Sequence, residues 1–391
     1  DCATGLRAIK ERGSKYLPRL GGQLTDADEG YVSYLGRAQY FNAVGRTIDS
    51  MAGHVFRKQP KVELPAALEE YKADINMSGL SLEGFASNLV DEVIKVGRAG
   101  VLVEYPQADD TEDGSKITVE QSRSMGVRPY LTTYAAEDII NWSTDTVNNA
   151  TVLVKVFLKE LYGEDDKTQI RELFLDGGYG QRIWRRNDKS NTWVIHSEIF
   201  PRKNGALIDA IPFFPVGVKE ADISVQAPPL EGLADTCIAY YQLSADYRNA
   251  LHVAASPTPW VNGITNPDEF PEMHIGCNTF LLLPPDAGIG FLEFKGTSIQ
   301  EQRLAIEDTR KEMAAQGARM LENDKRAAES AEAQGIKRGG ENSILASLSG
   351  AVEMSIAKAL GFMAEWVGAS PDDVVFELNK DYLPNKLDSA I

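Results

Sequence analysis

The sequence has few of the residues that most often carry catalysis or bind metals. Its 391 residues include three cysteines, Cys2, Cys237 and Cys277, and four histidines. The cysteines are odd in number and far apart, a spacing that neither frames a set of disulfides nor matches a zinc site. We therefore predict free, buried thiols in a reducing compartment and no bound metal.

Long hydrophobic runs are also missing. The longest apolar stretches, such as residues 152–158 and 280–283, are far shorter than the roughly 20 residues of a membrane span. No charged segment followed by an apolar one opens the sequence, as it would in a secretory leader. We therefore expect a protein without a membrane segment that is made in a cytoplasm.

Positive charge is in deficit. Acidic residues number 57 and basic residues 40, which gives a net charge of −17. A protein that coats nucleic acid by neutralising phosphates is basic, so this balance excludes simple DNA coating, and it does not suit an anionic membrane surface. The 43% of hydrophobic residues is ordinary for a folded protein, and the length suggests two or three substructures.

The motifs of common enzyme classes are absent too. No phosphate-binding loop of the Walker type, no three-glycine dinucleotide fingerprint and no Gly-x-Ser-x-Gly elbow occurs. The histidines are scattered along the chain, and paired carboxylates are expected in any acidic sequence. We predict that the protein is not an enzyme and needs no cofactor, although a site assembled in space from distant residues leaves no such sequence pattern.

Hydrophobic periodicity predicts helices in the first 100 residues and strands after them. Apolar residues at mostly helical spacing predict one long helix over 31–51, and Ser81 is placed to cap a second helix that ends at Gly97. A buried strand is predicted over 101–105. Short β runs divided by Gly, Asn and Asp turns predict an antiparallel section, with strands at 151–158, 170–175, 181–185 and 192–195.

The last third of the sequence reads as three long helices and a small β module. One helix is predicted over 230–256, where Pro257 and Pro259 end it. Two short strands follow, at 279–283 and 290–294, and a second helix begins near Ile299. The polar residues 323–342 are predicted to form a loop, followed by a helix over 343–367 and a strand over 374–378. The expected fold class is α+β.

Several short sequences resemble, in their order along the chain, those of one protein family. They are Tyr16-Leu17-Pro18, Arg37-Ala38-Gln39-Tyr40-Phe41-Asn42, Val55-Phe56-Arg57-Lys58-Gln59-Pro60, Gly97-Arg98-Ala99-Gly100-Val101-Leu102-Val103-Glu104, Arg128-Pro129-Tyr130, Ile139-Ile140-Asn141-Trp142, Pro228-Pro229-Leu230, Ser244-Ala245-Asp246-Tyr247, Pro257-Thr258-Pro259 and Met313-Ala314-Ala315-Gln316-Gly317-Ala318. With the order of elements in the C-terminal half, they make nearly the whole chain resemble the portal proteins of tailed double-stranded DNA bacteriophages.

The resemblance implies a portal-type fold and a place for each segment in it. It assigns the segments as follows: 1–227 to a wing of N-terminal helices and a β-rich section, 228–256 and 299–322 to a two-helix stem, 257–298 to a small β-containing clip, 323–342 to a tunnel loop, and 343–391 to a long helix and strand that return to the wing.

The resemblance also implies a function. Portal proteins form a ring, typically of twelve subunits, at one capsid vertex of the virion, the head–tail connector through which DNA enters and leaves. The expected partners are other copies of the chain, double-stranded DNA held without sequence specificity, the terminase large subunit, the major capsid and scaffolding proteins, and a neck or tail adaptor. Another acidic ring or scaffold protein of the particle, such as a neck adaptor, is the alternative, and a cytoplasmic enzyme is a third possibility.

Three groups of residues are candidate sites under this resemblance. Packing between subunits of the stem is predicted for Leu233, Tyr240, Tyr247, Leu251, Ile299, Ile306 and Met313, with packing inside one subunit as the alternative. Contacts with passing DNA are predicted for the tunnel-loop residues Lys325, Arg326, Glu329, Lys337 and Arg338, whose basic members would touch phosphates; an ordinary solvated loop is the alternative. Partner docking, or else burial in the clip, is predicted for Trp260, Phe270, Phe280 and Leu282.

Overall fold

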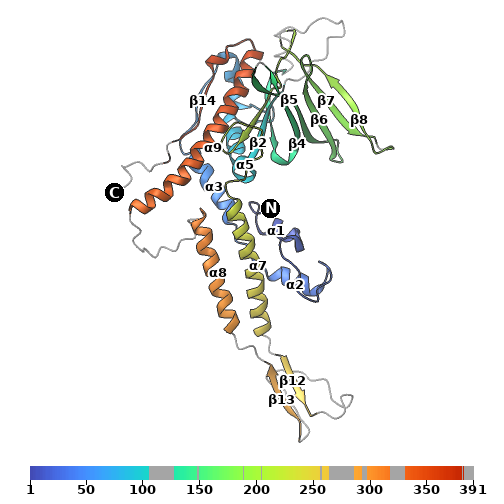
Figure 1. Ribbon diagram of the computed structural model, residues 1–391, viewed down its shortest axis with the longest axis vertical. Coiled ribbons are helices and arrows are strands. Elements are labelled where there is room, and N and C mark those ends of the chain that lie inside the picture. The colour runs from blue at the N-terminus through green and yellow to red at the C-terminus, as the bar shows by residue number, and fades with distance from the viewer. Residues whose placement is uncertain are drawn as a thin grey trace. The chain divides into compact units, whose positions relative to one another are not determined.

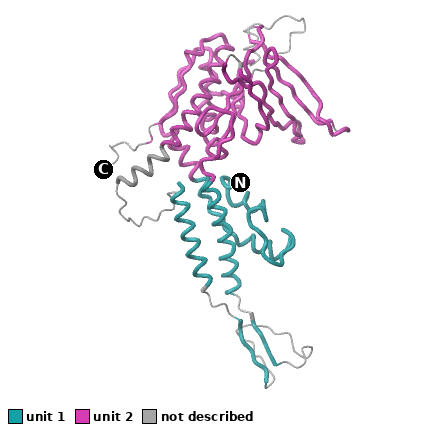
Figure 2. The backbone as a smooth tube through the Cα atoms, viewed as in Figure 1, with its two compact units in different colours: residues 1–46, 232–325 teal, residues 47–231, 326–391 magenta. Residues whose placement is uncertain are grey.

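The computed structural model describes residues 1–104, 127–147, 149–187, 189–203, 205–255, 258–263, 286–292, 297–317, 331–380 and 382. They form two compact units, each assembled from segments distant in sequence (Figure 2). Unit 1 contains residues 1–46 and 232–325, and unit 2 contains residues 47–231 and 326–391. Helices and antiparallel sheets occur in both units, so the predicted α+β class is confirmed.

Unit 1 is mainly helical (Figure 1). In chain order its elements are α1 (Leu6–Glu11), η1 (Gly13–Lys15), α2 (Glu29–Arg37), the start of α3 (Ala43–Val55), α7 (Glu231–Ala254), β12 (Thr258–Asn262), β13 (Gly288–Leu292) and α8 (Thr297–Ala315). The predicted helices over 230–256 and from Ile299 are therefore confirmed as α7 and α8. Of the two strands expected between them, 290–294 corresponds to β13, whereas 279–283 lies outside the described residues.

The single long helix predicted over 31–51 is wrong, because the chain forms two helices there, α2 and α3. Ala38 ends α2 with an extended backbone at ψ 137°, and the amide oxygen of Asn42 accepts a hydrogen bond from the backbone N–H of Gly45 at the start of α3. Between them the backbone of Gln39 bonds to Ser244 instead of to its own helix. A contact with a residue 205 positions away thus decides the break, and helical periodicity cannot reveal it.

Unit 2 holds the remaining elements. Its helices are the rest of α3, α4 (Ala66–Glu69), η2 (Glu70–Ala73), α5 (Leu82–Val96), η3 (Ala136–Asp138), α9 (Ala331–Trp366) and η6 (Pro371–Asp373). Its strands are β1 (Lys61–Glu63), β2 (Arg98–Glu104), β3 (Tyr130–Ala135), β4 (Ile139–Val147), β5 (Ala150–Tyr162), β6 (Lys167–Leu175), β7 (Tyr179–Arg186), β8 (Trp193–Ile199), β9 (Arg202–Lys203), β10 (Ala206–Leu207), β11 (Phe213–Gly217) and β14 (Val375–Glu377).

The start of α5 follows the sequence prediction closely. The Ser81 hydroxyl accepts a hydrogen bond from the backbone N–H of Gly84 at 3.1 Å, and Gly97 ends the helix in the left-handed conformation at φ 78°. A residue with a Cβ at position 97 would also meet the carbonyl oxygen of Gln226 at 2.6 Å. Glycine is therefore needed there for both conformation and space.

Two antiparallel sheets form most of unit 2. The smaller has the order β11-β2-β3, and the larger is a five-stranded meander in the order β4-β5-β6-β7-β8. The four strands predicted between residues 151 and 195 are β5 to β8, so the antiparallel section is confirmed. The strand predicted over 374–378 is also confirmed, because β14 pairs with β1 in register from Lys61↔Glu377 to Glu63↔Val375.

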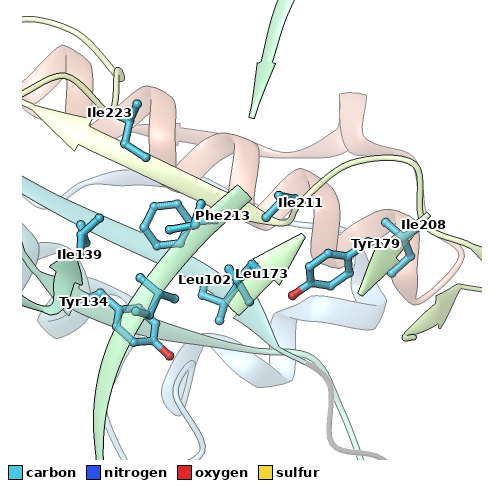
Figure 3. Packing of buried hydrophobic residues seen from close by; sticks show 11 residues of the cluster. Leu102, Tyr134, Ile139, Leu173, Tyr179, Ile208, Ile211, Phe213 and Ile223 are labelled. Atoms are coloured by element: carbon cyan, nitrogen blue, oxygen red, sulfur yellow. The ribbon is translucent and has the colours of Figure 1, made fainter. Parts of the chain in front are cut away.

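A hydrophobic cluster joins the two sheets (Figure 3). Leu102, Tyr134 and Phe213 come from the small sheet, and Leu158 and Leu173 come from the five-stranded sheet. Helices α5 and α9 also pack on β2. Burial of these side chains, at roughly 25 cal/mol for each Å² of apolar surface, gives unit 2 its main cohesion.

Helix α9 begins twelve residues earlier than predicted, at Ala331 rather than Ser343, so residues 331–342 are helical. The alanine, glutamate, glutamine, lysine and arginine residues of this stretch are good helix formers, and they outweigh the glycines that suggested a loop. The portion Ser343–Trp366 has the length and composition of a membrane span. More than half of its apolar window is buried within the structure, as in the core helix of a globular fold.

Candidate functional site

The candidate site is the helical hairpin of unit 1, formed by α7 and α8 and their strand pair (Figure 1). At one end, the Thr236 hydroxyl near the start of α7 donates to the Gln316 side-chain oxygen just after α8, at 3.1 Å. At the other end, β12 and β13 pair antiparallel from Thr258↔Leu292 to Asn262↔Gly288. The two helices therefore run antiparallel, with the strand pair closing one end, which we call the tip.

Residues of the N-terminal segment pack along one face of α7. The Tyr34 hydroxyl donates to the Asp246 carboxylate at 2.5 Å, and Arg248 donates to the side-chain oxygen of Gln39. The Gln242 amide donates to the carbonyl oxygen of Tyr16 at 2.8 Å. Burial, followed by the bond to Asp246, raises the pKa of Tyr34, so its hydroxyl stays protonated and the bond persists at neutral pH.

The buried face of α7 carries Leu233, Cys237, Tyr241, Ser244 and Ala245. The rings of Tyr241 and Tyr40 meet edge to face with centroids 6.3 Å apart. This face is therefore occupied by the subunit's own N-terminal segment. The family resemblance implied that this segment belongs to the wing, and its contact with α7 was not predicted.

The tip half of the hairpin exposes a group of large apolar side chains. They are Leu251, Val253, Trp260, Ile289, Phe291, Leu292 and Leu304. Phe291 is 51% exposed and Leu292 is 66% exposed. The Trp260 indole lies over Gly290, where an added Cβ would meet the ring at 2.7 Å. A pair of strands is marginally stable alone in water, so apolar side chains on such a ladder favour a covering partner.

The predicted stem residues divide into three classes. Leu233 and Met313 are buried, Tyr240, Tyr247, Ile299 and Ile306 are half-buried, and Leu251 is exposed. Burial of the first two matches the alternative that part of the set packs inside one subunit. The side chains of the half-buried and exposed residues remain accessible in the single chain, as packing between subunits requires.

The other two groups fall largely outside the described residues. Of the clip residues, Trp260 is described and 45% exposed, whereas Phe270, Phe280 and Leu282 lie outside the described part of the chain. Among the tunnel-loop residues, Lys325, Arg326 and Glu329 lie outside it as well. Lys337 and Arg338 fall in the first turns of α9.

The residues that sequence reasoning missed are those of the N-terminal contact, above all Tyr34, Gln39 and Tyr241. The signal was present in part, because Gln39 and Ser244 each lie in a short sequence that carries the family resemblance. What linear sequence lacks is the pairing of those two motifs, which the hydrogen bonds to Ser244 and Asp246 reveal.

The hairpin is acidic. Helices α7 and α8 contain seven acidic and four basic residues. Its ion pairs are exposed and local, such as Lys311 with Asp308 at 2.7 Å, and contribute little to stability. Within the described ranges, no cluster of histidine, cysteine and carboxylate side chains is suited to hold a metal ion.

Unit 2 has a polar network of its own between its two sheets. The Arg171 guanidinium lies 3.2 Å from the Glu104 carboxylate and 2.7 Å from that of Glu160. The Tyr134 hydroxyl donates to Glu160 at 2.6 Å, and the Tyr130 hydroxyl donates to Glu104 at 3.0 Å. Each carboxylate therefore has a cation and a hydroxyl as partners, as buried charges require.

This network shifts the titration of its members. Burial alone would raise the pKa of Glu160, but the charge of Arg171 and the hydrogen bonds from Tyr134, Gln169 and Arg171 outweigh it, and the pKa of Glu160 is lowered. Burial and the neighbouring Glu104 raise the pKa of Tyr130 to about 12. At neutral pH the network therefore holds a charged Glu160 and neutral phenols.

Comparison with known proteins gives one family match and several similar structures. A family model described as a domain of unknown function, DUF4055, matches residues 229–367. No curated protein is significantly similar to the chain.

Three of the similar structures are chains of gene transfer agent (GTA) particles. A chain of the native GTA virion is 12% identical, with a TM-score of 0.45 over 98% of this chain and 91% of that chain. A chain of the empty-particle neck, computed with C6 symmetry, is 13% identical, with a TM-score of 0.45 over 97% and 90% of the two chains. A chain of the native-particle neck, computed with C12 symmetry, is 11% identical, with a TM-score of 0.42 over the same shares.

Proposed function

We propose that the chain is a portal subunit, which assembles into a ring at one capsid vertex of a phage-like particle and encloses the channel for double-stranded DNA. The sequence resemblance supports this proposal, and one structural observation carries it. That observation is the antiparallel hairpin whose tip half exposes large apolar side chains, among them Leu251 and Leu304 on the helices and Phe291 and Leu292 on the strand pair.

Copies of the same chain are the natural cover for this surface. In a ring, each hairpin has an identical hairpin on either side, so one surface of the hairpin packs against a different surface of its neighbour in a head-to-tail contact that closes. The heptad spacing of Ile299, Ile306 and Met313 suits packing between neighbouring helices. Because Met313 is already fully buried, the proposed contact between subunits uses the two half-buried positions and the exposed Leu304.

The proposal assigns the described segments to parts of a portal. Helices α7 and α8 are the stem, β12 and β13 belong to the clip, and the sheets of unit 2 belong to the wing. Residues 1–46 go with the stem, because they pack on α7 within unit 1. In this scheme the clip docks the terminase large subunit and later a neck or tail adaptor, and the wing meets the capsid and scaffolding proteins.

The charge of the hairpin suits a channel through which DNA slides. A surplus of carboxylates on α7 and α8, repeated around a ring, repels phosphates and prevents tight binding. Brief contacts are assigned to Lys325, Arg326, Lys337 and Arg338, with Glu329 between them.

The first experiment is the mass of the purified protein in solution, with negative-stain images of the same sample. We expect particles near twelve times 42.9 kDa with a central hole. A monomer that forms no ring even on concentration would overturn the proposal. A closed ring that lacks a hole wide enough for duplex DNA would favour a scaffold role instead.

The DNA contacts need a separate test. Changing Lys325, Arg326, Lys337 and Arg338 together to glutamine should alter DNA packaging or retention while the ring still forms. A matched control neutralises exposed basic residues outside the tunnel loop, such as Lys167 on β6 and Lys189 in the turn between β7 and β8, and should change neither. Loss of the ring in the fourfold variant would contradict the assignment of these residues to DNA.

A further inference from the structure

One loop of unit 1 presents a leucine almost wholly to solvent. Residues 19–26 lie between η1 and α2, and we call them the Leu24 loop. Leu24 is 83% exposed, more than any other large apolar side chain in the described ranges. Leu20 in the same loop and Val32 on α2 are exposed as well. Single exposed apolar residues are common on protein surfaces, so the exposure gains its meaning from how the loop is held.

The Leu24 loop is fixed by its own polar groups. The Arg19 guanidinium donates to the carbonyl oxygen of Leu24 and lies 3.7 Å from the Asp26 carboxylate. That carboxylate also accepts a hydrogen bond from the backbone N–H of Ser14 at 3.0 Å. The leucine is therefore presented by an ordered loop, which lowers the entropy cost of binding a partner. Because Arg19 and Asp26 face each other, the loop adds no unpaired charge from these two residues to a contact.

The N-terminal segment and α8 lie to either side of α7 (Figure 1). On α7, Gln242 and Asn249 are hydrogen-bonded to the N-terminal segment, and Thr236 is hydrogen-bonded to Gln316, just after α8. At 3.6 residues per turn, Gln242 and Asn249 are rotated by about 120–140° around α7 from Thr236. A molecule that approaches α7 from the side away from α8 therefore meets the N-terminal segment first.

The exposed part of α8 is level with that segment. The two helices run antiparallel from the contact between Thr236 and Gln316. Counting equal numbers of residues along both places Leu304 about level with Arg248, since the rise per residue is the same. Arg248 is one of the residues of α7 that bond to the N-terminal segment. Leu304 is 46% exposed, and Ile306 beside it is half-buried.

We propose that the Leu24 loop docks on α8 of the neighbouring subunit, with Leu24 against Leu304 and Ile306. This inference rests on the proposed function, because it requires a ring. In a head-to-tail ring, the side of one subunit that carries the N-terminal segment faces the α8 side of the next. Since the N-terminal segment covers α7 on that side, it is the segment, and not α7 itself, that meets the neighbour's α8 at this level. Both surfaces are apolar, and the contact removes both from water.

Photochemical cross-linking of the full-length protein tests the contact directly. The photoreactive amino acid p-benzoylphenylalanine takes the place of Leu24, and purified rings are irradiated. We expect a covalent dimer on a denaturing gel, and peptide mapping should join position 24 to residues of α8 (Thr297–Ala315). The same photoreactive residue in place of Glu164, in the exposed turn between β5 and β6, is the control and should give no link to α8.

A second variant measures the contact without a bulky probe. Leu24→Ala should leave the circular dichroism and the Tm of the unassembled chain unchanged, because the side chain is exposed there. It should raise the protein concentration at which half of the chains are in rings by roughly tenfold, as loss of an apolar anchor does. Thr25→Ala, at the next exposed position of the loop, is the matched control and should not shift that concentration.

The outcomes separate this contact from the proposed function. Rings whose cross-links from position 24 stay within one chain, or join residues outside α8, would overturn the contact and leave the portal proposal standing. Rings of Leu24→Ala that assemble at the concentration of the unaltered protein would do the same. Failure of the unaltered chain to form rings at all would overturn the proposed function, and the contact with it.

Discussion

The hydroxyl of Ser244 lies between the two backbone polar groups of Gln39, 2.9 Å from the nitrogen and 2.7 Å from the carbonyl oxygen. Ser244 is buried on α7, and Gln39 lies in the extended link between α2 and α3. One side chain therefore replaces the helical hydrogen bonds that the link gives up. The contact fixes both the break in the N-terminal helix and the place where it docks.

Replacing Ser244 with alanine should lower the free energy of unfolding by about 1 kcal/mol, because it removes the hydrogen bonds between a buried hydroxyl and the part-buried backbone groups of Gln39. Urea unfolding of the purified protein measures the change. Ser33→Ala, at an exposed position of α2, is the matched control and should be neutral or slightly stabilising. Equal losses in both variants would show that the Ser244 contact contributes nothing special.

Unit 2 should become less stable at acid pH, because Glu160 is then protonated. Its pKa is lowered in the fold, so the carboxylate adds stability that is complete above its unfolded pKa, near 4.5, and is lost as the pH falls through the lower folded value. Glu160→Gln should lower the free energy of unfolding at pH 7 and should make its decrease toward acid pH, the acid limb of the pH profile, less steep. Unfolding midpoints between pH 7 and pH 3 give the comparison.

Glu164→Gln, in the exposed turn between β5 and β6, is the control for that series. It removes the same charge outside the network and should leave the acid limb of the pH profile unchanged. An unaltered limb in Glu160→Gln would show that other carboxylates govern acid unfolding.

Local signals predicted much of the fold, and tertiary contacts account for what they missed. Capping by Ser81 and the stop at Gly97 are local chemistry, and the turns that divide β5 to β8 are equally visible in sequence. The break at Ala38 and the pairing of Gln39 with Ser244 depend on residues 205 positions apart. Periodicity reports that a face is apolar without reporting what covers it, so it could not separate the buried face of α7 from the exposed tip.

Two glycines should respond to alanine in opposite directions. At Gly100 on β2 an added Cβ would lie 2.1 Å from the ring of Phe213, so Gly100→Ala should destabilise unit 2 by about 1–3 kcal/mol through overpacking. At Gly53 on α3 nothing lies within 4 Å, and Gly53→Ala should stabilise by about 1 kcal/mol through helix propensity. Thermal unfolding of the two variants distinguishes them, and the same sign in both would contradict the packing described here.

Charged substitutions on α8 should distinguish a residue that is needed for assembly from one that is needed for folding. Leu304 is 46% exposed and Met313 is fully buried on the same helix. Leu304→Asp should give a folded protein with fewer or no rings, because the charge enters a contact between subunits. Met313→Asp should unfold unit 1, because it buries an unpaired charge. Light scattering measures ring assembly, and circular dichroism measures folding. Intact rings in Leu304→Asp would show that Leu304 does not lie in the contact between subunits.

The division of unit 1 between two distant stretches has a consequence for how the protein is made. Residues 1–46 leave the ribosome well before α7, the helix against which they pack, because that helix begins at residue 231. At about 5–20 residues per second, synthesis of the intervening chain takes roughly 10–40 s. During that interval the aromatic side chains of Tyr34 and Tyr40 have no α7 to pack against. The nascent chain thus carries an unfinished hydrophobic surface for which chaperones are the natural temporary cover, and unit 2 can begin to fold before residues 1–46 pack on α7.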